Sequence, residues 1–111
     1  MAITYDDFAK VDIRVGVVVQ VEDFPRARLP SYRVRVDFGP ELGLKTSSVG
    51  AKREYTPEEL LGRQVLAVVN FPPKNVAGFL SEVLILGVPA EDGSLVLLQP
   101  SRPARLGGKV Y

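Results

Sequence analysis

The sequence has 111 residues, which suits a single folded domain with an apolar core of its own. It contains no cysteine and no histidine, which excludes disulfides, thiolate chemistry, the commonest zinc ligand and the usual general base near neutral pH. The net charge of +1 excludes a uniformly basic nucleic-acid binder, so any RNA contact has to come from a local basic patch.

The first residues are acidic and lead into no long apolar run. We therefore expect neither a secretory signal nor insertion into a membrane, and we interpret the chain as a cytoplasmic protein. Thr4 and Asp7 have the spacing of a capping box, which predicts a short helix near the N-terminus.

Apolar and polar residues alternate over 11–22, which predicts a long strand with one buried face. Gly16 lies inside this strand, where a glycine permits a bend or a bulge. Similar alternation predicts a second strand over 32–38, and 44–49 predicts a third, weaker one. A long first strand that contains a glycine suits a small barrel, in which it curls across both halves of the wall.

Thr56, Pro57 and Gly62 mark a short helix, with a capping residue, a proline at the first helical position and a glycine at the end. Strands are predicted after it, over 64–69 and 82–86.

The dipeptide Asp92-Gly93 predicts a hairpin turn, followed by a further strand over 95–98. The tail from residue 99 onward is rich in proline and glycine and should be extended rather than helical.

This order of elements lacks a regular alternation of strands and helices, which argues against a parallel sheet. It predicts an all-β OB-fold, a five-stranded Greek-key barrel with a short N-terminal helix and a short helix between strands 3 and 4. We expect one domain over 1–111, with its core at about 11–99. Several late strands are apolar on both faces, which favours a homodimer whose terminal extensions, 1–10 and 100–111, help to cover them.

No motif for a nucleotide or a metal ion is present. Lys45, Ser47 and Ser48 suggest a serine–lysine dyad, but nothing supplies an oxyanion hole, and a polar strand edge beside a binding surface is the favoured interpretation. The sequence therefore predicts a binding protein rather than an enzyme, without catalytic residues, cofactor or metal site.

Four arginines gather around the loop before the second strand and on that strand: Arg26, Arg28, Arg33 and Arg35. They predict either a grip on phosphate or carboxylate groups, or a solvated strand face paired with nearby acidic side chains.

The segment 68–84 carries two phenylalanines and almost no charge, although a solvated loop is usually polar. Pro72 and Pro73 predict a stiff loop after the fourth strand. Phe71 and Phe79 are then either anchors for an apolar ligand or plugs that close the end of the barrel. Exposed anchors on a stiff loop predict weak binding of many polypeptides, because little ordering opposes that binding.

Three stretches resemble the stand-alone tRNA-binding-domain family, and within it most closely the bacterial export-related chaperones: "DFAKVDIRVG", "LKTSSVGAKREYTPEELLGRQVLAVVNFPP" and "AGFLSEVLILG". The resemblance covers essentially the whole chain. It implies an OB-fold homodimer that binds unfolded or precursor polypeptides and is linked to the Sec export machinery. It also implies kinship with tRNA-binding modules appended to methionyl-tRNA synthetases, so tRNA is the alternative partner.

Residue analysis and the resemblance together define the predicted site. The peptide-binding group consists of Phe71, Pro72, Pro73, Val76, Ala77, Gly78, Phe79, Ser81 and Glu82. The group that binds either RNA or peptide consists of Lys45, Ser47, Ser48, Asn70, Lys74, Arg26, Arg28, Arg33 and Arg35. The tRNA-binding relatives carry more basic residues after the asparagine, so a positively charged rim has become an apolar one here. A subunit that only dimerises a partner is a third interpretation.

Overall fold

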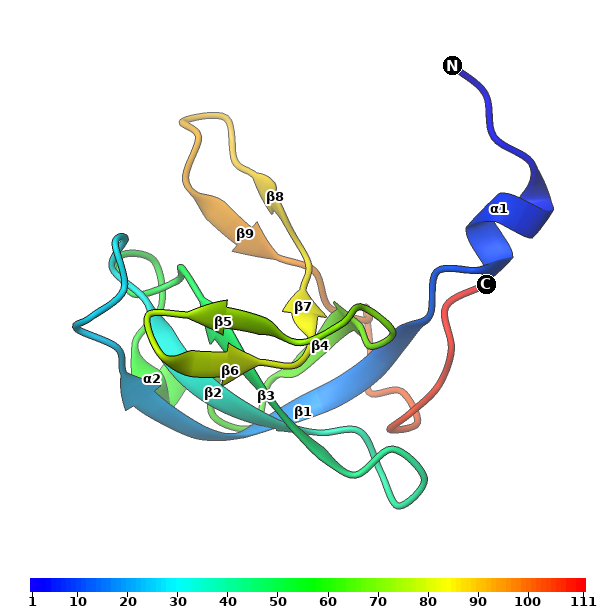
Figure 1. Ribbon diagram of the computed structural model, residues 1–111. Coiled ribbons are helices and arrows are strands. Elements are labelled where there is room, and N and C mark those ends of the chain that lie inside the picture. The colour runs from blue at the N-terminus through cyan, green and yellow to red at the C-terminus, as the bar shows by residue number, and fades with distance from the viewer.

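The computed structural model describes all 111 residues and shows a nearly closed antiparallel barrel (Figure 1). Its five-stranded sheet has the order β3-β2-β1-β4-β7. The strands are β1 (Ile13–Asp23), β2 (Tyr32–Asp37), β3 (Leu44–Val49), β4 (Gln64–Val68) and β7 (Leu84–Ile85). The predicted all-β, five-stranded barrel of the OB type is confirmed.

Both predicted helices are present: α1 (Tyr5–Ala9) and α2 (Pro57–Leu60). Each begins with a capping box. The box of Thr4 with Asp7 is the predicted one, and the structure adds a second, formed by Thr56 with Glu59. Helix α1 stands away from the barrel, beside the C-terminus (Figure 1). Neither helix has the length or the apolar character that crossing a bilayer requires.

Strand β1 serves both halves of the wall, because its first part pairs with β4 and its second part with β2. The predicted bulge is not at Gly16; the register shifts between Val18 and Gln20 instead. Gly16 has another role, since a Cβ there would lie 2.5 Å from Val36 Cγ1 and 2.8 Å from Phe38 Cε1. The glycine lets the buried side chains of Val36, in β2, and Phe38, just after β2, pack directly against the β1 backbone.

The core fills the barrel between β1, β2 and β4 and is closed at one end by α2. Val18, Val36, Phe38 and Val65 are essentially inaccessible to solvent, and Leu60 of α2 packs into the same cluster. The alternation marks the inward face of β2 correctly. On β1 the predicted face is wrong at the centre of the strand, because Gly16 and Val18 face the core and Val19 is exposed.

The barrel closes between β3 and the segment before β7 through individual backbone and side-chain hydrogen bonds rather than a regular strand pair. The Thr46 backbone donates to Glu82 Oε1 at 3.0 Å and accepts from the Glu82 N–H at 2.8 Å. The Ser47 hydroxyl donates to the Val83 carbonyl at 3.0 Å. The predicted strand over 82–86 is therefore wrong in extent: its first residues close the barrel, and only Leu84–Ile85 pairs with β4.

The expectation of a loop over 70–81 is wrong for most of its length, because 74–81 forms a hairpin of β5 (Lys74–Val76) and β6 (Phe79–Ser81). Its two-residue turn places Ala77 at φ 48° and Gly78 at φ 86°. Asn75 Oδ1 accepts from the Gly78 N–H at 2.8 Å and secures this turn. Only 70–73 keeps the irregular character that the prolines predict.

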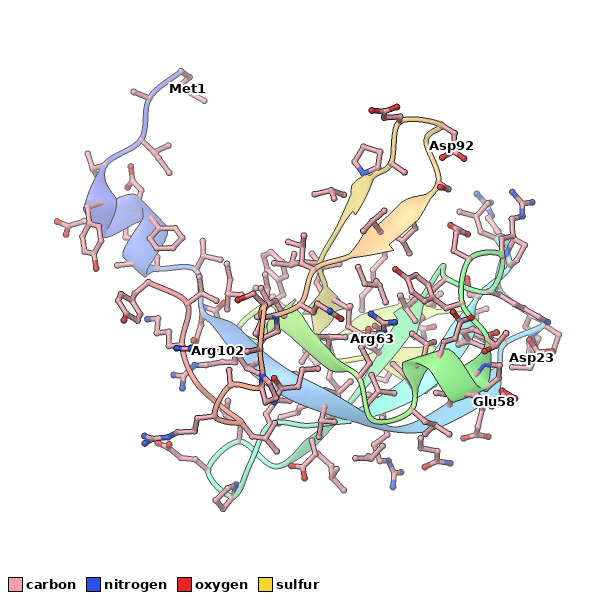
Figure 2. All side chains as sticks on the ribbon, turned by 180° about the vertical axis from the view of Figure 1, so that it is seen from behind. Met1, Asp23, Glu58, Arg63, Asp92 and Arg102 are labelled. Atoms are coloured by element: carbon pink, nitrogen blue, oxygen red, sulfur yellow. The ribbon has the colours of Figure 1, made fainter.

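A second hairpin, β8 (Gly87–Pro89) with β9 (Leu95–Leu97), projects from the barrel (Figure 1). Its turn contains the predicted Asp92-Gly93, with Gly93 at φ 87°. Asp92 lies near the outer end of this projection (Figure 2).

The C-terminal tail is extended, as predicted, and lies along β1 of its own chain. Val15 donates to Gly108 and accepts from Gly107, and the Val110 N–H donates to Ile13. The tail thus covers the first part of β1.

Candidate functional site

A groove of about 510 Å³ opens at the base of the β5–β6 hairpin. Five predicted residues form its walls: Ser48, Phe71, Pro72, Lys74 and Val76. The predicted Ser81 and Glu82 also line it, together with Val83 and Leu84, which the sequence analysis did not identify. Four strands (β3, β5, β6 and β7) and the proline segment therefore form one apolar recess. Pro73 is exposed beside this groove and Lys45 is half-buried on β3, and neither residue lines it.

The two phenylalanines have different environments. Phe71 has 53% of its surface exposed and stands at the groove. Phe79 is half-buried and packs edge-on against Phe24, with ring centroids 5.5 Å apart. Phe71 is therefore accessible to a ligand in the groove, whereas Phe79 belongs largely to the barrel end.

Several predicted polar site residues hold the hairpin in place. Ser81 Oγ accepts from the Ser48 N–H at 3.0 Å, and Glu82 accepts from Thr46. Ser47 has no exposed surface, so the prediction that it forms part of the binding surface is wrong. These contacts attach β6 to β3 and fix the floor of the groove.

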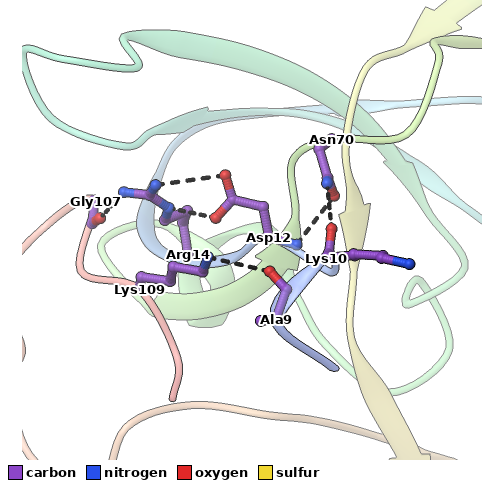
Figure 3. Close-up of polar contacts among 7 residues, drawn as sticks. All are labelled: Ala9, Lys10, Asp12, Arg14, Asn70, Gly107 and Lys109. Atoms are coloured by element: carbon purple, nitrogen blue, oxygen red, sulfur yellow. Dashed lines mark hydrogen bonds and ion pairs between the residues drawn. The ribbon is translucent and has the colours of Figure 1, made fainter. Parts of the chain in front are cut away.

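Asn70, which precedes Phe71, bonds to the segment between α1 and β1 (Figure 3). Its Oδ1 accepts from the Asp12 N–H at 3.1 Å, and its Nδ2 donates to the Lys10 carbonyl at 2.7 Å. Asp12 accepts from Arg14 Nε at 2.6 Å, which raises the pKa of Arg14, and Arg14 Nη1 donates to Gly107 at 2.9 Å. These bonds thus fix the chain just before Phe71 to the N-terminal arm, and the Asn70 side chain does not line the groove.

At the tip of the hairpin, Arg26, Arg33, Phe79 and the turn Ala77-Gly78 line a smaller recess of about 220 Å³. The Arg33 guanidinium lies over the Phe79 ring at 5.9 Å, and its buried Nε has no hydrogen-bond acceptor. Arg33 therefore packs as part of the hairpin support, while Arg26 is exposed.

Other basic residues lie around the β1–β2 loop. Arg28 and Arg53 are exposed and take part in no ion pair, and both line a shallow recess there. Lys52 is different, because its Nζ lies 2.6 Å from Asp23 Oδ1. Arg35 is exposed on β2 and lines neither recess. The four predicted arginines therefore do not form one cluster.

The Lys52–Asp23 pair allows a pH test. The hydrogen bond from Lys52 holds the pKa of Asp23 below its usual range. We expect Lys52→Gln to raise that pKa toward the ordinary value. The pair's stabilisation is present above the unfolded-state pKa of Asp23 and is lost as the pH falls through the lower folded-state value.

The measurement is an NMR titration of the carboxyl carbons. Asp92 is the internal control, because its pKa is lowered by Ser94 and should stay unchanged in the variant. An Asp23 titration that is identical in both proteins would contradict the assignment.

Residues 13–109 match the family model described as "Putative tRNA binding domain". The chain is 44% identical over 111 residues to a methionine–tRNA ligase of Pyrococcus abyssi, covering 99% of this chain and 15% of the ligase. It thus spans only a small part of the curated ligases that it matches.

Two solved structures align over nearly the whole of both chains. The CsaA chaperone protein of Picrophilus torridus is 44% identical, with a TM-score of 0.92, covering 99% of this chain and 100% of that one. The chaperone CsaA of Bacillus anthracis is 49% identical, with a TM-score of 0.92 and full coverage of both chains. Sequence and fold agree with the resemblance seen in the motifs, and the chain belongs to the tRNA-binding-domain family.

Proposed function

We propose that this protein is a binding protein of the chaperone type, which holds extended segments of unfolded or precursor polypeptides in the groove beside Phe71. The observation that carries the proposal is the exposed Phe71 ring at a recess whose other walls include Pro72, Val76 and Leu84. An aromatic or aliphatic side chain buried there gains about 1.5–3 kcal/mol. One such contact is weaker than millimolar binding, so micromolar binding requires several contacts along the segment.

The similarity to two proteins named as CsaA chaperones supports this proposal. We propose one domain over 1–111 that acts as a homodimer in the cytoplasm and meets the Sec export machinery. Exposed apolar side chains on the N-terminal arm and on the projecting hairpin support the dimer: Ile3, Tyr5, Val88 and Val96.

The direct test is fluorescence anisotropy with a labelled, permanently unfolded polypeptide. Its folded, unlabelled counterpart is added as a competitor. We expect saturable micromolar binding that the unfolded form displaces and the folded form does not. Absence of binding at millimolar protein, or equal competition by the folded form, would contradict the proposal.

A second candidate function is tRNA binding at the β1–β2 loop. The exposed, unpaired Arg26, Arg28 and Arg53 favour it, as does the similarity to part of the methionine–tRNA ligases. Lys74, at the other end of the hairpin, adds one further positive charge.

We expect the triple change Arg26→Gln, Arg28→Gln, Arg53→Gln to weaken tRNA binding and to reduce its salt dependence. Each phosphate contact contributes a slope of roughly 0.7–0.9 in log affinity against log salt. Arg102→Gln is the control, because Arg102 lies at the opposite end of the molecule from Asp23 and this loop (Figure 2). If the unaltered protein fails to bind tRNA at low salt, tRNA binding is removed as a candidate function.

A further inference from the structure

The β5–β6 hairpin has a register that directs its backbone groups in alternate directions. The paired residues are Lys74 with Ser81, Asn75 with Leu80, and Val76 with Phe79, and a two-residue turn joins the last pair. In such a hairpin the pair next to the turn exchanges hydrogen bonds, and the following pair points its N–H and C=O groups outward. The Asn75 and Leu80 backbones therefore point away from each other.

The outward groups of β6 already have partners on β3. The Leu80 carbonyl accepts from Thr46 Oγ1 at 2.8 Å, and the Glu82 N–H donates to the Thr46 carbonyl at 2.8 Å. These bonds confirm that the Leu80 backbone points away from β5. They also hold the outward edge of β6 against β3.

The opposite edge of the hairpin is free. Asn75 is exposed, and neither its N–H nor its carbonyl makes a backbone hydrogen bond outside the strand ladders. Pro73 before it and Ala77 after it are exposed too. An unpaired strand edge in water is a template for an added strand.

We infer that the bound polypeptide adds to the β5 edge as a third strand of the hairpin, held by the N–H and C=O of Asn75. This inference rests on the proposed function and names the mode by which the polypeptide is recognised. Backbone groups are the same in every polypeptide, so such binding is independent of sequence.

The position of the groove fits an added strand. Lys74 and Val76 lie on the face of β5 opposite Asn75, and both line the groove. Alternate side chains of a strand added at this edge point to that same face, toward the recess beside Phe71. One edge then offers two backbone hydrogen bonds and an apolar recess to the same ligand.

Peptide N-methylation tests the backbone contact. An unstructured heptapeptide with a central leucine is methylated at one backbone nitrogen at a time, and each affinity is measured by calorimetry with the full protein. We expect an alternating pattern, in which methylation facing β5 weakens binding about tenfold and methylation at the next residue changes little.

A protein variant tests the same contact from the other side. Asn75→Pro removes the outward N–H at a strand edge, where a proline is tolerated, and it also removes the side-chain bond to the turn. Asn75→Ala removes only the side-chain bond and is the matched control. We expect Asn75→Pro to bind the unmethylated peptide about tenfold more weakly than Asn75→Ala, with both variants folded by circular dichroism.

The outcomes separate the two claims. Tight binding of every methylated peptide, or equal affinities of the two Asn75 variants, would overturn strand addition and leave the groove as the polypeptide site. Failure of the unmethylated peptide and of the unfolded polypeptide to bind at all would overturn the proposed function as well.

Discussion

Replacement of Phe71 by serine is expected to lower the affinity for an unfolded polypeptide at least tenfold and to abolish suppression of its aggregation. The ring is the most accessible large apolar group of the groove, and its loss removes about 1.5–3 kcal/mol of apolar burial on binding. Since the side chain is half exposed, the fold should survive. Anisotropy titration and light scattering of an aggregating client measure the two effects.

Leu80→Ser is the matched control for this change. Leu80 has the same exposed fraction as Phe71, 53%, but lies on the outer face of the hairpin with Asn75 and does not line the groove. General surface hydrophobicity would make the two variants equivalent. Equal losses of affinity in both would therefore contradict a specific role of the groove.

The largest expected effect on stability comes from Gly16→Ala. The added methyl group would lie within 3 Å of Val36 and Phe38, which are both fully buried, so the core would have to shift. Overpacking of this kind costs about 1–3 kcal/mol of unfolding free energy, and each kcal/mol lowers the Tm by roughly 4 °C in a domain of this size.

Urea unfolding followed by circular dichroism measures the change. Gly50→Ala is the control, because a Cβ there meets only Ser31 Oγ at 3.8 Å and the backbone does not require a glycine. If the urea midpoint of Gly16→Ala equals that of the unaltered protein, the core beside Gly16 has room for a methyl group, which would contradict the close contact with Val36 and Phe38.

Much of the fold follows from local patterns in the sequence. Alternation predicts β1 and β2, Thr4 with Asp7 predicts the start of α1 through a capping box, and Thr56 with Pro57 predicts the start of α2. The Asp92-Gly93 turn follows from the positive φ that its glycine adopts.

The site is harder to predict, because contacts between distant segments decide it. Ser47 and Glu82 look like polar surface residues in the sequence, yet they close the barrel through bonds that span some 36 positions. The β5–β6 turn uses Ala77-Gly78, which is a weaker signal than Asn-Gly. The apolar loop leaves open whether Phe71 is exposed or buried, and only the structure places it exposed in a groove with Leu84.

The central claim is that the groove at the base of the β5–β6 hairpin receives an extended polypeptide. Amide chemical-shift changes on titration with an unfolded polypeptide test it most directly. The largest changes are expected at Phe71, Lys74, Asn75, Val76 and Leu84, with little change along β8 and β9. Changes confined to the β1–β2 loop, or spread evenly over the surface, would contradict it.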